Sequence, residues 1–226
     1  TSEDYINGYD PQGTTLGAEL VQELESMDGV EATGHQYSHQ FVWQFDDQMT
    51  ENLKGFYTEE MLNDWASYDP TGVDAFHQAV DTRQMNAVIF GLDGIPLDTI
   101  TQTQHIMQGS FDPDTFATGE YVLAIGPAIG ADEEYPVLPV PSVGSTITLE
   151  GKDYTVMAVV YPVMSIDDGA AESGTPASME QHFILPADTF RQNWPDNTLR
   201  KLFLNVDDEH IDAVQTWLDD YTATVD

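Results

Sequence analysis

The sequence contains no cysteine among its 226 residues. This absence excludes a disulfide framework, a thiol nucleophile and a cysteine-based zinc site. Long apolar runs are also missing. The longest, Val156 to Met164, has nine residues and contains Pro162, whereas a helix that crosses a bilayer needs about 20 residues. The chain has neither an initiating methionine nor an apolar leader, so we expect it to be a segment of a longer protein.

Positive charge is scarce. Six lysine and arginine residues face 40 aspartate and glutamate residues, which gives a net charge of −34. A surface of this sign repels nucleic acid and anionic membrane surfaces, so we exclude both as direct electrostatic partners. The acidic residues are spread along the whole chain and form no acidic tail, which is typical of a solvated surface that keeps a protein soluble. A cationic peptide or a basic partner protein remains compatible with this charge.

Sequence signatures of catalysis and of nucleotide binding are absent. The chain has no G-x-S-x-G nucleophile elbow, no phosphate-binding loop and no G-x-G-x-x-G motif. None of its carboxylate groupings has the twelve-residue pattern of an EF-hand. His35 and His39 lie four residues apart on an expected strand, roughly 13 Å from each other, too far to share one metal ion. We therefore predict no catalytic residue, no metal and no cofactor.

The pattern of apolar residues predicts an α+β protein, and the 41 % apolar content is sufficient for a globular core. Leu16 to Met27 has helical spacing, and His35 to Phe45 alternates as a strand with one buried face. Thr58 can cap a short helix, a second helix follows Pro70, and residues 86–92 form an apolar strand.

The second half of the chain is first richer in strands and then returns to the earlier pattern. Residues 121–125 form a strand, and 145–149 and 154–160 form a hairpin. Strand 182–185, a helix from 186 to about 193, strand 199–206 and a helix over 208–221 follow.

This order predicts one α+β lobe built from both chain ends, residues 1–104 and 181–226, and an inserted β-rich lobe over 105–180. Strands 37–45, 86–92, 182–185 and 199–206 should be neighbours in one sheet, because the helices at both ends of the chain each need a sheet face to cover.

Two groups of residues are candidates for binding a partner or a substrate. The first is aromatic: Tyr37, Phe41 and Trp43 share one face of the strand, where core packing is the commoner role and a groove for an apolar or peptidic substrate the alternative. The second group is acidic and could attract a cationic partner. It comprises Asp132, Glu133, Glu134, Asp167, Asp168 and Glu172.

Three segments resemble the extracytoplasmic domain of FtsX- and MacB-type ABC-transporter permeases. The first reads Leu24-Glu-Ser-Met-Asp-Gly-Val30 and leads into a strand. The second pairs Gly109-Ser-Phe with Gly119-Glu-Tyr-Val-Leu123. In the third, Val143-Gly-Ser-Thr-Ile-Thr-Leu149 leads into Tyr154-Thr-Val-Met-Ala-Val-Val160. Each motif alone is common, but their order agrees with the family over most of the chain.

The resemblance implies a ferredoxin-like porter lobe with an inserted sabre-like β lobe, outside the cytoplasm and anchored in the cell membrane. It also implies transmembrane helices on either side, a separate cytoplasmic ABC ATPase as partner, and coupling without catalysis. Two other interpretations stay open at this point: a secreted α+β binding or adhesion module, and a secreted hydrolase.

Overall fold

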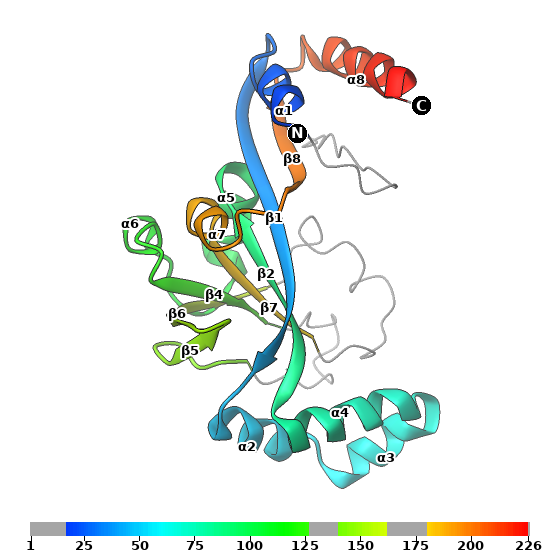
Figure 1. Cartoon of the computed structure of the whole chain (residues 1–226), viewed down its shortest axis with the longest axis vertical. Coiled ribbons are helices and arrows are strands. Elements are labelled where there is room, and N and C mark those ends of the chain that lie inside the picture. The colour runs from blue at the N-terminus through cyan, green and yellow to red at the C-terminus, as the bar shows by residue number, and fades with distance from the viewer. Residues whose placement is uncertain (1–16, 127–139, 162–179, 226) are drawn as a thin grey trace.

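The computed structural model describes residues 17–126, 140–161 and 180–225. One mixed sheet organises this part of the chain, in the order β3-β6-β4-β7-β2-β1-β8, with β5 paired to β6 at one side. The α+β class predicted from the sequence is confirmed. Figure 1 shows α1 and α8 at one end of the molecule and α2, α3 and α4 at the other, with the sheet between them.

Strand β1 (Val30–Gln44) connects the two ends. It pairs antiparallel with β8 (Leu199–Val206) over its first half and with β2 (Gln84–Leu92) over its second half. Beyond β2, strand β7 (Glu180–Pro186) adds in parallel. The four strands expected to be neighbours therefore are neighbours, and that prediction is confirmed.

The remaining strands continue the same sheet. They are β3 (Ile106–Gly109), β4 (Tyr121–Ile125), β5 (Thr146–Leu149) and β6 (Lys152–Val160). Strand β4 is antiparallel to β7 and parallel to β6, while β5 and β6 form the expected hairpin. The division of the chain into two lobes stays a prediction, and the β4–β7 pairing is where the two parts would meet.

Helices cover both faces of the sheet. They are α1 (Ala18–Glu25), α2 (Asp47–Phe56), α3 (Glu59–Tyr68), α4 (Pro70–Thr82), α5 (Gly94–Ile100), α6 (Pro113–Phe116), α7 (Ala187–Asn193) and α8 (Ile211–Val225), with a short 3₁₀ turn η1 at Thr103–His105. The expected cap forms, since the Thr58 hydroxyl accepts a hydrogen bond from the backbone N–H of Met61 at 3.2 Å. Asp46 and Asp69 cap α2 and α4 in the same way.

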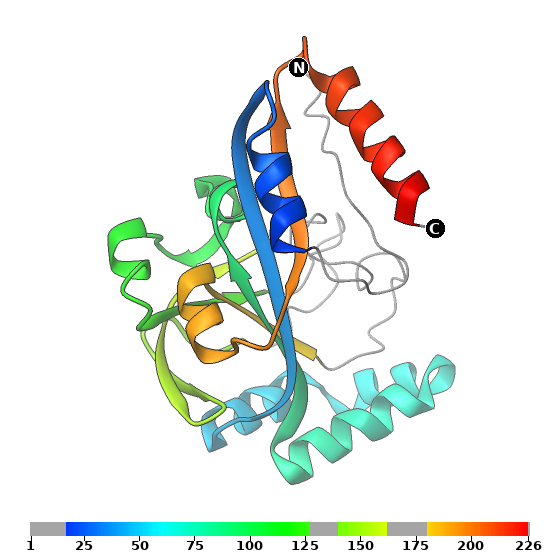
Figure 2. The ribbon, with the colours of Figure 1, turned by 45° about the horizontal axis from the view of Figure 1, so that its top comes forward.

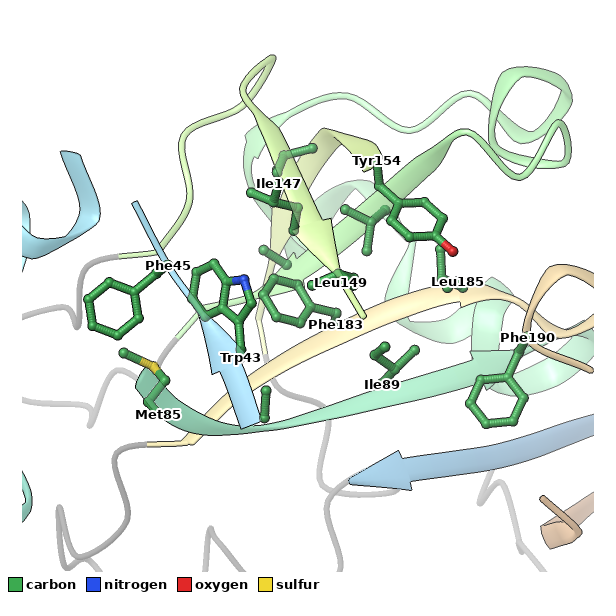
Figure 3. Packing of buried hydrophobic residues seen from close by; sticks show 14 of the residues in the cluster. Trp43, Phe45, Met85, Ile89, Ile147, Leu149, Tyr154, Phe183, Leu185 and Phe190 are labelled. Atoms are coloured by element: carbon green, nitrogen blue, oxygen red, sulfur yellow. The ribbon is translucent and has the colours of Figure 1, made fainter. Parts of the chain in front are cut away.

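Alternation along the strands sorts the buried side chains into two clusters. On β2, Ala87 and Ile89 belong to one cluster, whereas Val88 and Phe90 belong to the other, as expected when successive side chains point to opposite faces. The larger cluster lies under α1, α2, α4, α7 and the β5–β6 hairpin. Figure 3 shows its centre, where Phe183 lies among side chains from several strands. The smaller cluster lies under α5 and α6.

Candidate functional site

The face of β1 that points toward α7 carries the polar and aromatic groups of interest. Every second residue from 35 to 43 has its side chain on this face, in the order His35, Tyr37, His39, Phe41 and Trp43. The two histidines are partly buried, with side-chain exposures of 20 % and 24 %. His35 contacts two carboxylates from other elements and His39 contacts one, so this face brings together distant segments of the chain.

The aromatic residues predicted as a binding stripe lie at different depths. Trp43 is 3 % exposed and meets Phe183 edge to face at 5.1 Å, and Tyr37 is 9 % exposed and stacks on Phe190 at 5.7 Å. Both are part of the core. Phe41 is only partly buried and stacks on His39 at 6.2 Å. The predicted acidic site residues Asp132, Glu133, Glu134, Asp167, Asp168 and Glu172 lie outside the described residues.

His35 lies between two carboxylates from different elements. Its Nδ1 is 2.8 Å from Oδ1 of Asp93, and its Nε2 is 2.9 Å from Oε1 of Glu25. Asp93 follows β2, and Glu25 is the last residue of α1. The histidine therefore connects the N-terminal helix, the first strand and the turn before α5.

The backbone of this turn is what places Asp93. Its Oδ1 also accepts a hydrogen bond from the backbone N–H of His35 at 2.8 Å, and its own N–H donates to the carbonyl of His35 at 3.3 Å. Gly94 follows with φ of +52°, and a Cβ there would lie 2.0 Å from the carbonyl oxygen of Thr33. Only glycine allows such a close approach of the turn to β1.

The carboxylates change the titration of His35. The hydrogen bond that its ring donates to Asp93 raises the pKa of His35 above the ordinary value, and the charges of Asp93 and Glu25 add to this, while partial burial works in the opposite direction. The neighbouring Tyr37 has a raised pKa as well, mainly because of burial.

A second cluster surrounds His39. Its Nε2 is 2.9 Å from Oε2 of Glu150, and the same oxygen accepts a hydrogen bond from the Trp194 indole Nε1 at 2.6 Å. The rings of His39 and Trp194 stack at 5.2 Å. Glu150 lies in the β5–β6 turn with φ of +47°, so the tip of the hairpin contacts both β1 and the segment after α7.

The same hairpin makes further polar contacts with the end of α7. Asn193 donates a hydrogen bond from Nδ2 to the Tyr154 hydroxyl at 2.7 Å, and the Lys152 ammonium group donates to Oδ1 of Asn193. Together with the Glu150 contacts, these bonds hold the hairpin against the sheet face that carries His35 and His39. This side of the molecule is thus a set of ties between segments.

The comparison with protein families decides what kind of domain this is. The family model for the MacB-like periplasmic core domain matches residues 13–221, nearly the whole chain. The chain belongs to this family. The MacB-like chain is therefore an extracytoplasmic domain of a membrane ABC transporter, which confirms the resemblance noted in the sequence and favours it over a free secreted module or hydrolase.

Solved structures support the fold of this MacB-like domain. The extracellular domain of the noncanonic ABC-type transporter YknZ from Gram-positive bacteria superposes with a TM-score of 0.51 at 11 % identity, covering 93 % of this chain and 88 % of that one. The periplasmic region of MacB from Actinobacillus actinomycetemcomitans gives 0.52 at 9 % identity, covering 98 % and 82 %. No curated protein matches the sequence significantly.

Two features are absent from the described part of the MacB-like domain, a membrane-spanning helix and a metal-binding group. None of the helices in 17–126, 140–161 and 180–225 is long and apolar enough to cross a bilayer. In the same ranges, no group of three or more histidine, aspartate and glutamate side chains is arranged to hold a metal ion.

In the sequence, the two histidines of the MacB-like domain were considered only as a metal pair and excluded as one, and their carboxylate partners were not identified. Glu25 and Glu150 are ordinary acidic residues in a chain that has 40, and nothing local distinguishes them. Asp93 had the only usable signal, because an aspartate before a glycine at the end of an apolar strand indicates a tight turn. Which residue that turn contacts is a property of the tertiary fold.

Proposed function

We propose that this domain is the non-catalytic coupling part of its transporter, transmitting the movement of transmembrane segments to an extracytoplasmic substrate or partner. The observation that carries the proposal is the family match over residues 13–221, together with the position of α1 and α8 at one end of the fold (Figure 2). A domain held between two membrane segments needs both connections at the same end.

The contacts at this end support the proposal. The backbone N–H of Asp207 donates to the carbonyl of Gly29 at 2.9 Å, and Val30 pairs with Val206. The turn after α1 and the turn before α8 are therefore adjacent. From here β1 runs 15 residues, about 50 Å of strand, to the helices at the other end. Strand β1 is hydrogen bonded to β8 along its first half and to β2 along its second half. These bonds make β1 suited to transmit movement between the two ends as a stiff lever.

The contacts of His35 and His39 support the proposal that this domain has no catalytic role. Both ring nitrogens of His35 face carboxylates, so neither offers a free lone pair to a substrate as a general base would. The nitrogen of His39 that faces Glu150 is engaged in the same way. These side chains are better suited to hold segments together than to transfer protons to a ligand.

A distance measurement in the full transporter tests the coupling. Because this chain has no cysteine, spin labels can be attached at Glu19→Cys on α1 and Asp212→Cys on α8. We expect the distance between these labels to change by several ångströms, on the scale of known helix shifts, when a non-hydrolysable ATP analogue is added. Pulsed electron–electron double resonance measures the distance between the two labels directly.

A matched label pair separates movement of the ends from deformation of the sheet. Gln84→Cys and Asn205→Cys lie on the two strands that flank β1, at opposite ends of it and about 40 Å apart by strand rise. We expect this distance to stay constant. An unchanged distance between the α1 and α8 labels would refute the coupling. A changed distance between the labels at residues 84 and 205 would refute the role of β1 as a stiff lever.

We propose further that the partner which this domain contacts is neutral or basic, either a cationic peptide or a basic protein surface. The support is the net charge of −34, which attracts cations over about one Debye length, near 8 Å at physiological salt. Encounter would begin at the acidic segments around Asp132, Glu133 and Glu134 and at Asp167, Asp168 and Glu172. The partly exposed Phe41 would offer apolar contact, whereas Tyr37 and Trp43 would have to leave the core to do so.

A binding titration tests this partner chemistry. A cationic peptide should bind more weakly at physiological salt than at low salt, because exposed charges are screened. Replacing Asp132, Glu133 and Glu134 by their amides should weaken binding at low salt as well. If affinity depends on neither salt nor these substitutions, the acidic surface serves solubility alone.

A further inference from the structure

The hydrogen-bond geometry around His35 requires a specific protonation state. Both ring nitrogens lie within 2.9 Å of a carboxylate oxygen, Nδ1 at Asp93 and Nε2 at Glu25. A neutral imidazole has one N–H and one lone pair, so it would turn that lone pair toward one of the two carboxylates. Only the imidazolium donates to both, and the two contacts exist together only while the ring is charged.

We propose that His35 is a proton-operated latch, which fixes the end of α1 to the β2–α5 turn while the ring is protonated and releases α1 when the proton leaves. The latch goes beyond the proposed coupling function and does not depend on it, since it concerns only contacts within this chain.

The charged groups around His35 support a proton as the signal. Carboxylates face the ring from α1 and from the turn before α5, and Tyr37 stacks beside it at 6.5 Å. From α7, the Arg191 guanidinium lies over the Tyr37 ring, 5.9 Å from its centre, and also pairs with Asp188. On β8, Leu202 pairs with His35. Lys201 pairs with Gln36, and the side chains of this pair point to the opposite face of the sheet from His35.

The direction of the pH dependence follows from the raised pKa of His35. Because the folded value lies above the unfolded value near 6.5, the latch contributes fully at lower pH and is lost as pH rises through the folded pKa. Between pH 6 and pH 9, the lower pH therefore holds α1 and the higher pH releases it.

Helix α1 is a segment that one contact can control. It has eight residues, too few for an isolated helix to be stable in water. Leu24 is its only fully buried residue, and the side chains before it are partly or fully exposed. The loss of Glu25 from His35 leaves the helix attached mainly through Leu24 and its neighbours.

Hydrogen exchange on the purified 226-residue chain tests the latch. Protection of the α1 amides, corrected for intrinsic exchange, should fall about two- to fivefold between pH 6 and pH 9, the range expected for one partly exposed ion pair. His35→Gln should remove this pH dependence and leave α1 weakly protected at both values. His210→Gln is the matched control, because His210 also has a raised pKa, caused by Asp207, and lies against Gly29 in the turn that follows α1. It should preserve the effect.

An NMR titration of the His35 ring protons provides an independent measurement. We expect His35 to titrate above an ordinary histidine, and Glu25→Gln to lower its pKa while the fold is retained. An ordinary pKa for His35, equal α1 protection at both pH values, or a pH effect that disappears with His210→Gln instead of His35→Gln would each overturn the latch.

Discussion

Raising the NaCl concentration from about 10 mM to about 1 M is expected to raise the melting temperature of this domain by roughly 10–20 °C. The reason is self-repulsion, since the chain has 34 more acidic than basic residues. If each of the 34 excess charges has one like-charge neighbour, there are about 17 unfavourable pairs, and at about 0.2–0.5 kcal/mol each the total is on the order of 5 kcal/mol. For a chain of this size, each kcal/mol shifts the melting temperature by about 2–4 °C. Screening over about 3 Å at 1 M salt removes most of this repulsion.

At least three of the six basic residues that could offset this repulsion already form ion pairs at the surface. Lys54 pairs with Glu51 at 3.7 Å, and both Arg83 and Arg191 pair with nearby aspartates. Exposed pairs of this kind contribute less than about 1 kcal/mol each. The remaining carboxylates far outnumber them, so the folded state depends on counterions from the medium.

Calorimetry across a salt series measures the effect, and pH supplies the control. Near the isoelectric point of about 4.1 the net charge approaches zero, so the same series should change the melting temperature much less. A melting temperature that is independent of NaCl at neutral pH would contradict the repulsion argument. Equal salt slopes at both pH values would attribute the effect to general salt action on apolar surface instead.

Elements with a strong apolar period could be predicted closely. The strand over 199–206 has the predicted bounds, and the strand over 86–92 differs only by starting at Gln84. Strand β1 begins at Val30, five residues before the expected start, because pairing with β8 holds its polar first part in the sheet. Tertiary pairing thus extended a strand that its own pattern did not indicate.

Other features depend on contacts that no local pattern contains. Helix α5 has only seven residues and was not expected, since its start is set by the close approach of Gly94 to β1. The parallel pairing of β2 with β7 joins segments more than 80 residues apart. The His35 site has the same origin, because Glu25 and Asp93 reach the ring only when α1 and the β2–α5 turn are both in place. The sequence contains the histidine and the two carboxylates as separate residues, and only the tertiary fold brings them into contact.

Replacing Phe183 by alanine is expected to destabilise the domain by about 3–5 kcal/mol, which is roughly 6–20 °C in melting temperature. The side chain has no exposed surface and belongs to β7, where its neighbours across the strands are Ala124 on β4 and Ile89 on β2. It also meets Trp43 edge to face at 5.1 Å (Figure 3). Strands on both sides are fixed by hydrogen bonds, so the sheet cannot collapse into the cavity, and the cost should lie toward the upper end of this range.

Urea unfolding at a fixed high salt concentration measures this cost separately from the charge effect. The midpoint should fall while the slope stays constant, as expected for a cooperative loss of stability. Phe183→Leu keeps most of the volume and should cost about 1–2 kcal/mol. Val42→Thr is the matched surface control, because Val42 is 60 % exposed on β1 and threonine keeps the branched shape; it should change stability by less than about 0.5 kcal/mol. If Phe183→Ala cost no more than Val42→Thr, the strands that meet at β7 would not share the packed core described above, and the β4–β7 pairing would be a loose contact between two separate lobes.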